Sequence, residues 1–270
     1  MSSTQHAGSP QGDAPLGVAV IGAGYWGPNL VRNFRGSANW DLVGVCDLNA
    51  DRARKVIGNR STVEVFTDLA QVLDRDDVHA VAIATPAATH APIALAALAA
   101  GKHVVVEKPL ADTPEAATAM VQAAEQADRM LMIDHTYCYT PAVQHIRKVI
   151  ADGVLGDILY IDSVRINLGL IQPDVDVFWD LAPHDLSILD FVLPGGLRPE
   201  SVAASRCLAS LAWVVRSTPR SKIDTRCCGF RSSQTRVRRL PPITICRIFV
   251  GDSQFTLTWA IAPPGSGMLR

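Results

Sequence analysis

The amino-acid sequence predicts an α/β protein whose first half is a doubly wound parallel sheet, and two observations carry this prediction. Strand-like and helix-like segments alternate from residue 17 to residue 134, and a glycine-rich turn joins the first strand to the first helix. Alternation of this kind requires right-handed crossovers and a parallel sheet that is covered on both faces. We therefore expect a first domain over residues 16–135 and the start of a second α/β domain over 136–205.

Local patterns predict each element of the first domain. Short, largely apolar runs indicate buried strands, and they stand at 17–24, 41–47, 63–68, 79–86, 103–109 and 130–134. Helical patterns lie between them, at 25–34, 49–57, 69–74, 90–100 and 113–128. Pro28 is compatible with the first helix because proline is tolerated in a first turn.

The composition is that of a chain that can bury a sizeable core, with 270 residues, 48% of them hydrophobic and 19% charged. Residues 1–15 are polar and lack the basic start and apolar centre of a signal peptide, so we expect a disordered leader. The apolar stretch 81–100 is broken by Pro86 and Pro92, which argues against a membrane span. Six cysteines without metal-type spacing predict no metal site and a reducing, cytoplasmic setting.

Gly22, Gly24 and Gly27 form the pattern G-x-G-x-x-G at the first strand-to-helix turn. In a dinucleotide-binding domain one glycine makes the tight turn, one lets the backbone approach a pyrophosphate, and one lets the helix pack against the strand. The pattern alone is equally compatible with an ordinary glycine turn. Asp47 favours the dinucleotide-binding interpretation, because it ends the second strand, where an acid binds a ribose 2′-hydroxyl. NAD(H) is favoured over NADP(H), since a carboxylate there repels a 2′-phosphate.

Polar residues follow two later strands. Thr85 and Pro86 end the strand at 79–86, and Glu107 and Lys108 end the one at 103–109. Ligands of open α/β sheets bind at these carboxyl ends. A lone loop lysine is usually just solvated, but the proline that follows Lys108 restricts its backbone, which indicates a positioned residue.

Asp180 and His184 stand four residues apart in "FWDLAPHDLSIL". One interpretation makes Asp180 the N-cap of a helix through Val192, with Pro183 in its first turn. The other adds a proton-transfer pair, because residues four apart meet on one helix face and histidine titrates near working pH.

Several segments resemble the Gfo/Idh/MocA oxidoreductase family, chiefly its branch acting on sugars and nucleotide-linked sugars. They are "VAVIGAGYWGPNL", "CD", "ATPAATHAPIALAALAAGKHVVVEKPLA" and "WDLAPHDLSILDFVL", and together they extend the resemblance over about residues 15–205. The resemblance implies an N-terminal NAD(P)-binding Rossmann domain and a C-terminal α/β domain with an open, mostly antiparallel sheet that covers the substrate and often builds dimers. The resemblance also implies that Lys108, Asp180 and His184 correspond to the family's catalytic lysine, aspartate and histidine.

Other residues of these segments are expected at the cofactor or the substrate. Tyr25, Trp26 and His90 stand in the cofactor-binding segments. Tyr137 and Tyr139 leave the last parallel strand towards the crevice, although such tyrosines are as often packing residues. Arg165 and Asn167 lie on one face of the strand-like segment 157–170, where they can meet sugar hydroxyls or a phosphate; an exposed sheet face is the alternative. Asp134 stands where the family commonly has glycine.

The last part of the chain differs from the rest. Residues 1–205 hold 14 Lys and Arg against 24 Asp and Glu, whereas residues 206–270 hold 11 against 2, together with four of the six cysteines. Three interpretations compete: a basic tail that binds an acidic partner or nucleic acid, a divergent folded end, and a stretch translated out of frame from near Arg206. The third is favoured, because little strand-like alternation follows residue 205. It predicts an irregular tail and an incomplete second sheet.

Two functions follow. The first is an NAD-dependent dehydrogenase of a sugar or nucleotide-linked sugar; the second is a cofactor-binding sensor or an inactive relative. Lys108, Asp180 and His184 favour the first, because a sensor needs no proton-transfer residues. A nucleic-acid or membrane partner is not expected, and a homo-oligomer of the family type is in doubt because of the tail.

Overall fold

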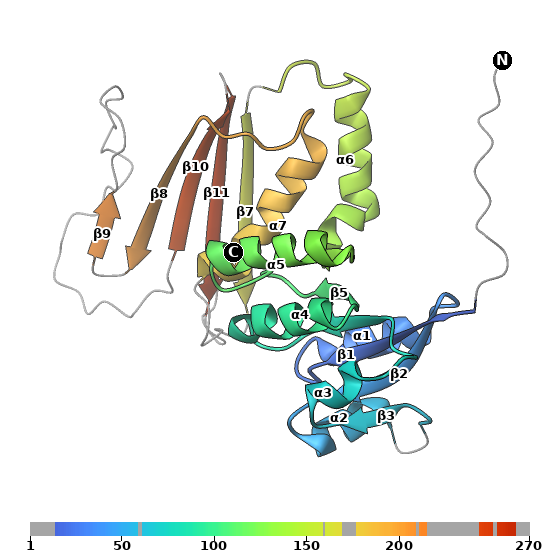
Figure 1. Cartoon of the computed structure of the whole chain (residues 1–270). Coiled ribbons are helices and arrows are strands. Elements are labelled where there is room, and N and C mark those ends of the chain that lie inside the picture. Colours follow the sequence, from blue (N-terminus) through green and yellow to red (C-terminus); the bar gives the residue numbers. More distant parts are fainter. Residues whose placement is uncertain are drawn as a thin grey trace, which may run out of the picture. The chain divides into compact units, whose positions relative to one another are not determined.

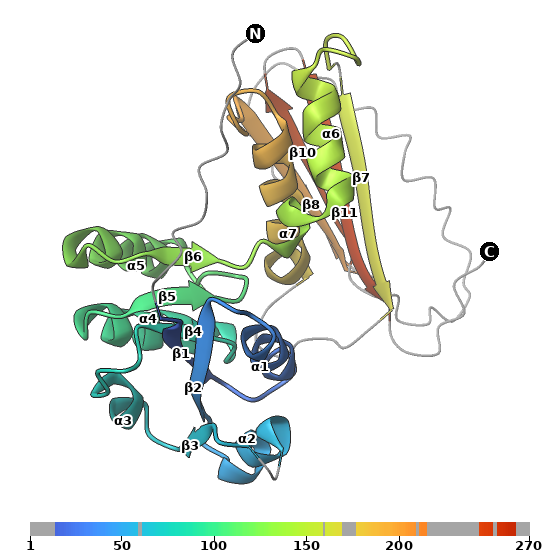
Figure 2. The same cartoon turned by 90° about the vertical axis from the view of Figure 1, so that its right-hand side faces the viewer.

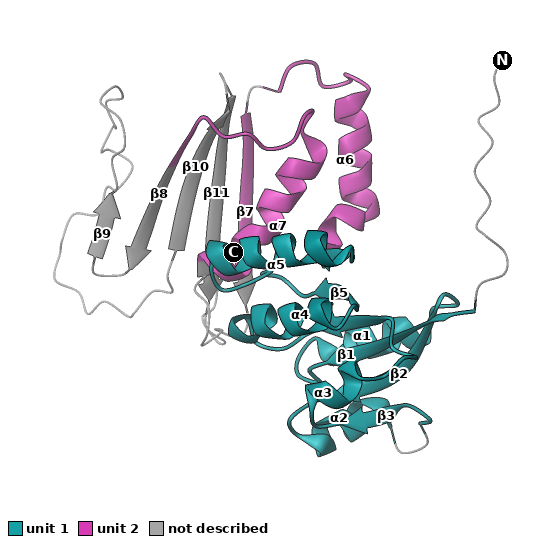
Figure 3. Cartoon of the chain, viewed as in Figure 1, with its two compact units in different colours: residues 1–134 teal, residues 135–270 magenta. Residues whose placement is uncertain are grey.

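The computed structural model describes residues 14–58, 61–158, 160–168, 177–208, 211–214, 243–250 and 253–262. It divides the chain into two compact units, Met1–Asp134 and His135–Arg270 (Figure 3). The leader predicted over residues 1–15 lies outside the described residues up to residue 13. No helix within the described ranges is long and apolar enough to cross a membrane.

The first unit is a six-stranded parallel sheet with helices on both faces, as predicted (Figure 1). Its strands are β1 (Leu16–Ile21), β2 (Trp40–Cys46), β3 (Glu64–Phe66), β4 (Ala80–Ile83), β5 (His103–Val106) and β6 (Leu131–Ile133). Its helices are α1 (Gly27–Arg35), α2 (Ala50–Ile57), α3 (Leu69–Leu73), α4 (His90–Ala99) and α5 (Pro114–Ala127), with a short 3₁₀ turn η1 (Ala87–Thr89). The order β3-β2-β1-β4-β5-β6 reverses direction between β1 and β4, and ligands of such sheets bind at that point.

The alternation of side chains along β1 explains why both faces of this sheet are covered. Ala19 and Ile21 belong to one apolar cluster and Val18 and Val20 to another, because successive strand residues point to opposite faces. Residues on both sides are buried, so the strand reads as a continuous apolar run.

The helices begin at residues whose side chains satisfy the free backbone N–H groups. Asn49 accepts hydrogen bonds from the backbone of Asp51 and Arg52 at the start of α2, and Thr113 accepts one from Ala116 at the start of α5. Such caps stabilise a helix by about 1 kcal/mol each.

The second unit combines a five-stranded sheet with two helices (Figure 2). Its elements are the 3₁₀ turn η2 (Thr136–Tyr139), α6 (Pro141–Ala151), β7 (Tyr160–Leu168), α7 (Val177–Val192), β8 (Ser201–Leu208), β9 (Leu211–Val214), β10 (Ile243–Val250) and β11 (Ser253–Ala262). The strand order is β7-β11-β10-β8-β9, in which β7 and β11 are parallel and the other pairs antiparallel. Helix α7 packs on β10 and β11, and α6 packs beside α7.

The prediction of an irregular tail is wrong for 243–250 and 253–262. These segments form an antiparallel hairpin, and β11 pairs with β7 along the whole of Tyr160–Leu168. The signal was present in "FTLTWAIA", where apolar residues alternate with threonine and alanine as in a half-buried strand. The basic, cysteine-rich stretch 215–242, on which the out-of-frame hypothesis mainly depends, lies outside the described residues.

The start of α7 also differs from the prediction. The helix begins at Val177, so Asp180 lies inside its first turn and is not the N-cap. Pro183 lies inside the helix, where it cannot donate a hydrogen bond to the carbonyl one turn earlier. The apolar stripe of Leu181 and Leu189 against Ile161 of β7 stabilises the helix in spite of this loss.

Leu98 and Leu48 provide a matched test of the core in the first unit. Leu98 on α4 is 1% exposed, and Leu48, the second residue after β2, is 95% exposed. We expect Leu98→Ala to lower the free energy of unfolding by about 2–5 kcal/mol, because it removes buried methyl groups and leaves a cavity. Leu48→Ala should change it by less than about 0.5 kcal/mol. Urea unfolding followed by circular dichroism measures both; equal effects would contradict the packing described above.

Candidate active site

The turn between β1 and α1 brings two backbone segments into close contact. Gly22 has a φ of +98°, and its N–H donates to the carbonyl of Cys46 at 2.8 Å. A Cβ on Gly27 would lie 2.3 Å from the carbonyl oxygen of Gly22, and a Cβ on Gly22 would lie 2.8 Å from the backbone of Ala84. Both positions therefore require glycine, and the start of α1 is held directly against the end of β1.

The loop between these two glycines is open. A Cβ on Gly24 would meet no atom within 4 Å. Helix α1 begins after Trp26 without a side-chain cap, and an uncapped helix N-terminus suits a phosphate group. Tyr25 and Trp26 are 71% and 43% exposed, and their rings contact each other edge to face with centroids 5.2 Å apart. This geometry leaves room for a pyrophosphate beside two exposed aromatic rings.

Asp47 ties the glycine turn to the end of β2. Its buried carboxylate accepts hydrogen bonds from the backbone N–H groups of Ala23 and Asn49, both at 2.8 Å. The guanidinium of Arg52 lies 3.5 Å from the same carboxylate. Because a carboxylate has about four lone-pair positions, Asp47 can accept further hydrogen bonds from ribose hydroxyls.

His90 holds two loops together from inside the first unit. It is 1% exposed, and its ring nitrogens lie 2.8 Å from the backbone carbonyls of Thr85 and Pro109. Carbonyl oxygens only accept, so a neutral ring satisfies one of these contacts and a charged ring satisfies both. No ring nitrogen remains for a cofactor. His90 was predicted as a cofactor contact, but this position makes it a support for the loops that follow β4 and β5.

Glu107 and Lys108 end β5 beside Asp134, which ends β6. The N–H groups of Glu107 and Asp134 donate to Ile83 and Val106 on the neighbouring strands, so both carboxyl groups lie at one edge of the sheet. Burial, and then the charge of Asp134, raise the pKa of Glu107 to about 7. The half-buried Lys108 precedes a cis peptide bond to Pro109. Asp134, which the sequence left without a role, thus influences the protonation of Glu107.

Asp180 and His184 lie one turn apart on α7, and both are half-buried. The imidazole of His184 contacts the ring of Tyr137 edge to face, with centroids 4.8 Å apart. Tyr139, the other tyrosine expected at the substrate, is 64% exposed. Lys108 lies in the first unit and Asp180 and His184 in the second, so their meeting at one substrate stays a prediction.

Arg165 is engaged inside the second unit. Its guanidinium makes two hydrogen bonds to Asp185, at 3.0 and 3.2 Å, and it was predicted to face the substrate. The side chain of Asn167, its expected partner on β7, lies outside the described residues. Asp185 was missed by the sequence reasoning. The signal for it is an acid between Leu181 and Leu189 on the apolar stripe of α7, where a charged residue needs a buried partner.

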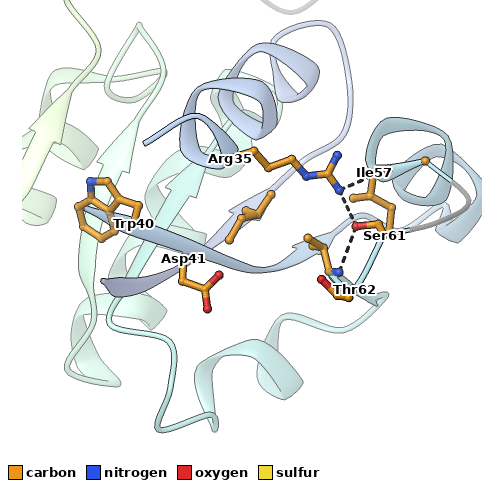
Figure 4. A pocket seen from close by; sticks show the side chains of 9 residues that line it. Arg35, Trp40, Asp41, Ile57, Ser61 and Thr62 are labelled. Atoms are coloured by element: carbon orange, nitrogen blue, oxygen red, sulfur yellow. Dashed lines mark hydrogen bonds between the residues drawn. The ribbon is translucent and has the colours of Figure 1, made fainter. Parts of the chain in front are cut away.

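A pocket in the first unit lies away from these residues (Figure 4). It is lined by residues at the beginning of β2, including Trp40 and Asp41, whereas Asp47 follows the other end of that strand. Arg35 in its wall donates to the carbonyl of Ile57 and to the hydroxyl of Ser61. The pocket is therefore no part of the cofactor crevice. Among the described side chains, no group of three or more His, Cys, Asp or Glu is arranged to hold a metal ion.

Comparisons with known proteins agree with this geometry. Residues 16–135 match the model of the Gfo/Idh/MocA oxidoreductases, a family with an NAD-binding Rossmann fold. A 4-carboxy-2-hydroxymuconate-6-semialdehyde dehydrogenase from Sphingobium sp. is 34% identical over 138 residues, which are 51% of this chain and 44% of that protein. A UDP-N-acetylglucosamine 3-dehydrogenase from Acidithiobacillus ferrooxidans is 33% identical over 190 residues, which are 69% of this chain and 56% of that protein.

A solved structure resembles the chain over nearly its whole length. GenD2 from gentamicin A biosynthesis, in complex with NAD, has a TM-score of 0.72 and 24% identity, and the match covers 96% of this chain and 69% of that one. At this identity the likeness concerns the fold. The chain spans about half the length of the curated relatives it matches.

Asp47 is expected to set the cofactor preference. In Asp47→Ala the carboxylate no longer repels a 2′-phosphate and Arg52 loses its partner, so the preference for NADH over NADPH should shrink by about tenfold, or about 1.4 kcal/mol. Fluorescence titration of both cofactors measures the change. Asp51→Ala is the control, because that side chain is 91% exposed and paired with Arg54. Tighter binding of NADPH than of NADH by the unaltered protein would contradict the role of Asp47.

Glu107 should make the stability of the protein depend on pH. Its pKa is raised from an ordinary 4.5 to about 7, so the stabilisation linked to its proton is present below pH 4.5 and is lost as the pH rises through 7. As the pH rises from 5 to 8, the free energy of unfolding of Glu107→Gln should therefore increase relative to that of the unaltered protein. Urea unfolding at several pH values measures the difference, with the exposed Glu125→Gln as control. A pH-independent difference would show that Glu107 is ionised in the folded protein.

Proposed function

Because residues 16–135 match the model of the Gfo/Idh/MocA oxidoreductase family, we propose that this chain is an NAD-dependent oxidoreductase that acts on a secondary hydroxyl of a nucleotide-linked sugar. The observation that carries the proposal is the carboxyl edge of the first sheet, where the glycine turn, Asp47 and Lys108 follow β1, β2 and β5. A sensor or an inactive relative is the second candidate.

The residues at this edge are suited to hold NAD. The open backbone at Gly24 and the N-terminus of α1 would hold the pyrophosphate, and Asp47 would accept hydrogen bonds from the ribose hydroxyls. Thr85, Pro86 and Glu107, at the ends of β4 and β5, border the nicotinamide half. When bound, the cofactor accepts or returns a hydride.

The proton is handled by the chain's own residues. His184 removes the proton from the hydroxyl that is oxidised, because an imidazole exchanges protons near neutral pH. Lys108 donates a hydrogen bond to the same oxygen and stabilises the negative charge that develops there. Asp180, one turn before His184, orients the imidazole.

The substrate class rests on the relatives. The alignment with the UDP-N-acetylglucosamine 3-dehydrogenase covers more than two thirds of this chain, and the name of that protein describes the class of activity we propose here. The dehydrogenase named for a semialdehyde favours an aldehyde substrate instead. Reduction of NAD in the presence of a panel of nucleotide-linked sugars, free sugars and aldehydes distinguishes the two classes. Cofactor binding without any turnover would favour the sensor.

Removal of either proton-handling residue should abolish most of the activity. With a sugar that is turned over, Lys108→Ala and His184→Ala should each lower kcat by about two to four orders of magnitude and leave the Kd of NADH nearly unchanged. Stopped-flow absorbance and fluorescence titration measure the two quantities. Lys55→Ala, an exposed lysine on α2, is the control. Loss of NADH binding together with kcat would instead assign structural roles to Lys108 and His184.

A further inference from the structure

Two elements of the second unit, α7 and β7, meet at a buried carboxylate. Asp185 on α7 is 5% exposed, and it accepts hydrogen bonds from the hydroxyl of Ser163 at 3.1 Å and from Nε and Nη2 of Arg165 at 3.0 and 3.2 Å. Ser163 and Arg165 share one face of β7, because they are two residues apart. A buried charge is tolerated only when it is paired and hydrogen-bonded, and Asp185 fulfils both conditions.

This pairing fixes the plane of the Arg165 guanidinium. Two parallel N–H···O bonds to one carboxylate are geometrically more specific than a single contact. Burial lowers the pKa of Arg165, but hydrogen bonds to Asp185 and Tyr137 outweigh it and raise the pKa, so the group stays charged. The guanidinium carbon lies 4.7 Å from the centroid of the Tyr137 ring, within the range of a cation–π contact.

The backbone next to Tyr137 is held in place as well. The next residue, Cys138, is buried; its thiol donates to the carbonyl of Ser187 on α7 at 3.4 Å, and its carbonyl accepts from Gln144 of α6 at 2.7 Å. The 3₁₀ turn η2 is therefore anchored to both helices. Between these anchors, the Tyr137 ring meets the imidazole of His184 at 4.8 Å and an interplanar angle of 77°.

We propose that Arg165 and Asp185 are positioning residues, which hold the ring of Tyr137 against His184 and thereby set the orientation of its imidazole. The inference rests on the proposed function only in that His184 is taken as the proton-transfer group. It replaces the expectation that Arg165 contacts the substrate. A misplacement of a reacting group on the order of 1 Å can lower a rate by about hundredfold, so an ion pair outside the site can control turnover.

The first test needs no substrate. It uses NMR spectroscopy of ¹³C-labelled protein, in which the imidazole Cε1–Hε1 signal of His184 is assigned with the variant His184→Asn. The chemical shift of this signal depends on the position of the imidazole relative to the Tyr137 ring, because the ring current of the tyrosine changes the local magnetic field. Arg165→Met should shift and broaden this signal. Arg147→Met is the matched control, because Arg147 stacks over a different aromatic ring of the same unit, that of Phe191, at 4.2 Å from its centroid. An unchanged His184 signal in folded Arg165→Met, or the same change in Arg147→Met, overturns the proposal.

Two further variants keep the test valid if the lone Met replacement does not fold with Asp185 unpaired. Arg165→Lys retains the charge but loses the two parallel bonds, and the double variant Arg165→Met with Asp185→Asn removes both charges together. Both should shift the His184 signal in the same direction as Arg165→Met. A double variant that is folded and keeps the original signal shows that the ion pair does not position His184.

Kinetics separate this inference from the proposed function. With a sugar that is turned over, Arg165→Lys should lower kcat by about ten- to hundredfold with little change in KM for the sugar or Kd for NADH. An increase in KM alone would show that Arg165 binds the substrate directly, and would overturn the positioning role. Failure of the unaltered protein to oxidise any sugar contradicts the proposed function, while the His184 signal still decides the inference.

Discussion

The close approach of backbone between β1 and α1 is the constraint on which the first unit depends. Because the Gly22 carbonyl lies where a Cβ of Gly27 would stand, the helix can begin directly over the end of the strand. Asp47 reinforces this arrangement, since its carboxylate binds the N–H of Ala23 inside the same turn. A larger residue at Gly27 would push α1 away from β1, and one at Gly22 would collide with the backbone of Ala84 after β4. The phosphate-binding geometry is therefore a consequence of how tightly the chain reverses there.

The carboxyl edge of the sheet concentrates charge because the strands are parallel. Every strand ends on the same side, so residues far apart in the sequence, such as Asp47, Glu107 and Asp134, gather there. Burial, and then the negative charge of Asp134 on the neighbouring strand, disfavour the ionised form of Glu107 and raise its pKa. His90 fixes the loops after β4 and β5 through their backbone carbonyls. Its burial shows that a residue in a cofactor-binding segment can act entirely through the backbone it holds.

The extent to which the sequence predicts this structure follows from the range of each interaction. The parallel sheet and the glycine turn were predictable because they depend on alternation and spacing within a few residues. The bidentate pair of Arg165 and Asp185 was not, because a strand and a helix twenty residues apart must fold before the two side chains meet. The hairpin of β10 and β11 was overlooked although it alternates, because the composition of the preceding stretch dominated the interpretation.

The buried ion pair of the second unit fixes the orientation of side chains without stabilising the fold more than apolar residues would. An apolar pair of similar size at Arg165 and Asp185 would stabilise the unit as well or better, since two charges lose their hydration on burial. Apolar side chains, however, could not make the cation–π contact that Arg165 makes with the ring of Tyr137. Two hydrogen bonds to Asp185 fix the plane of the guanidinium, and Ser163 donates to the same carboxylate, so the cation–π contact holds the Tyr137 ring in one place. The contact of that ring with His184 transfers this restriction to the imidazole, whose orientation decides whether it can exchange a proton.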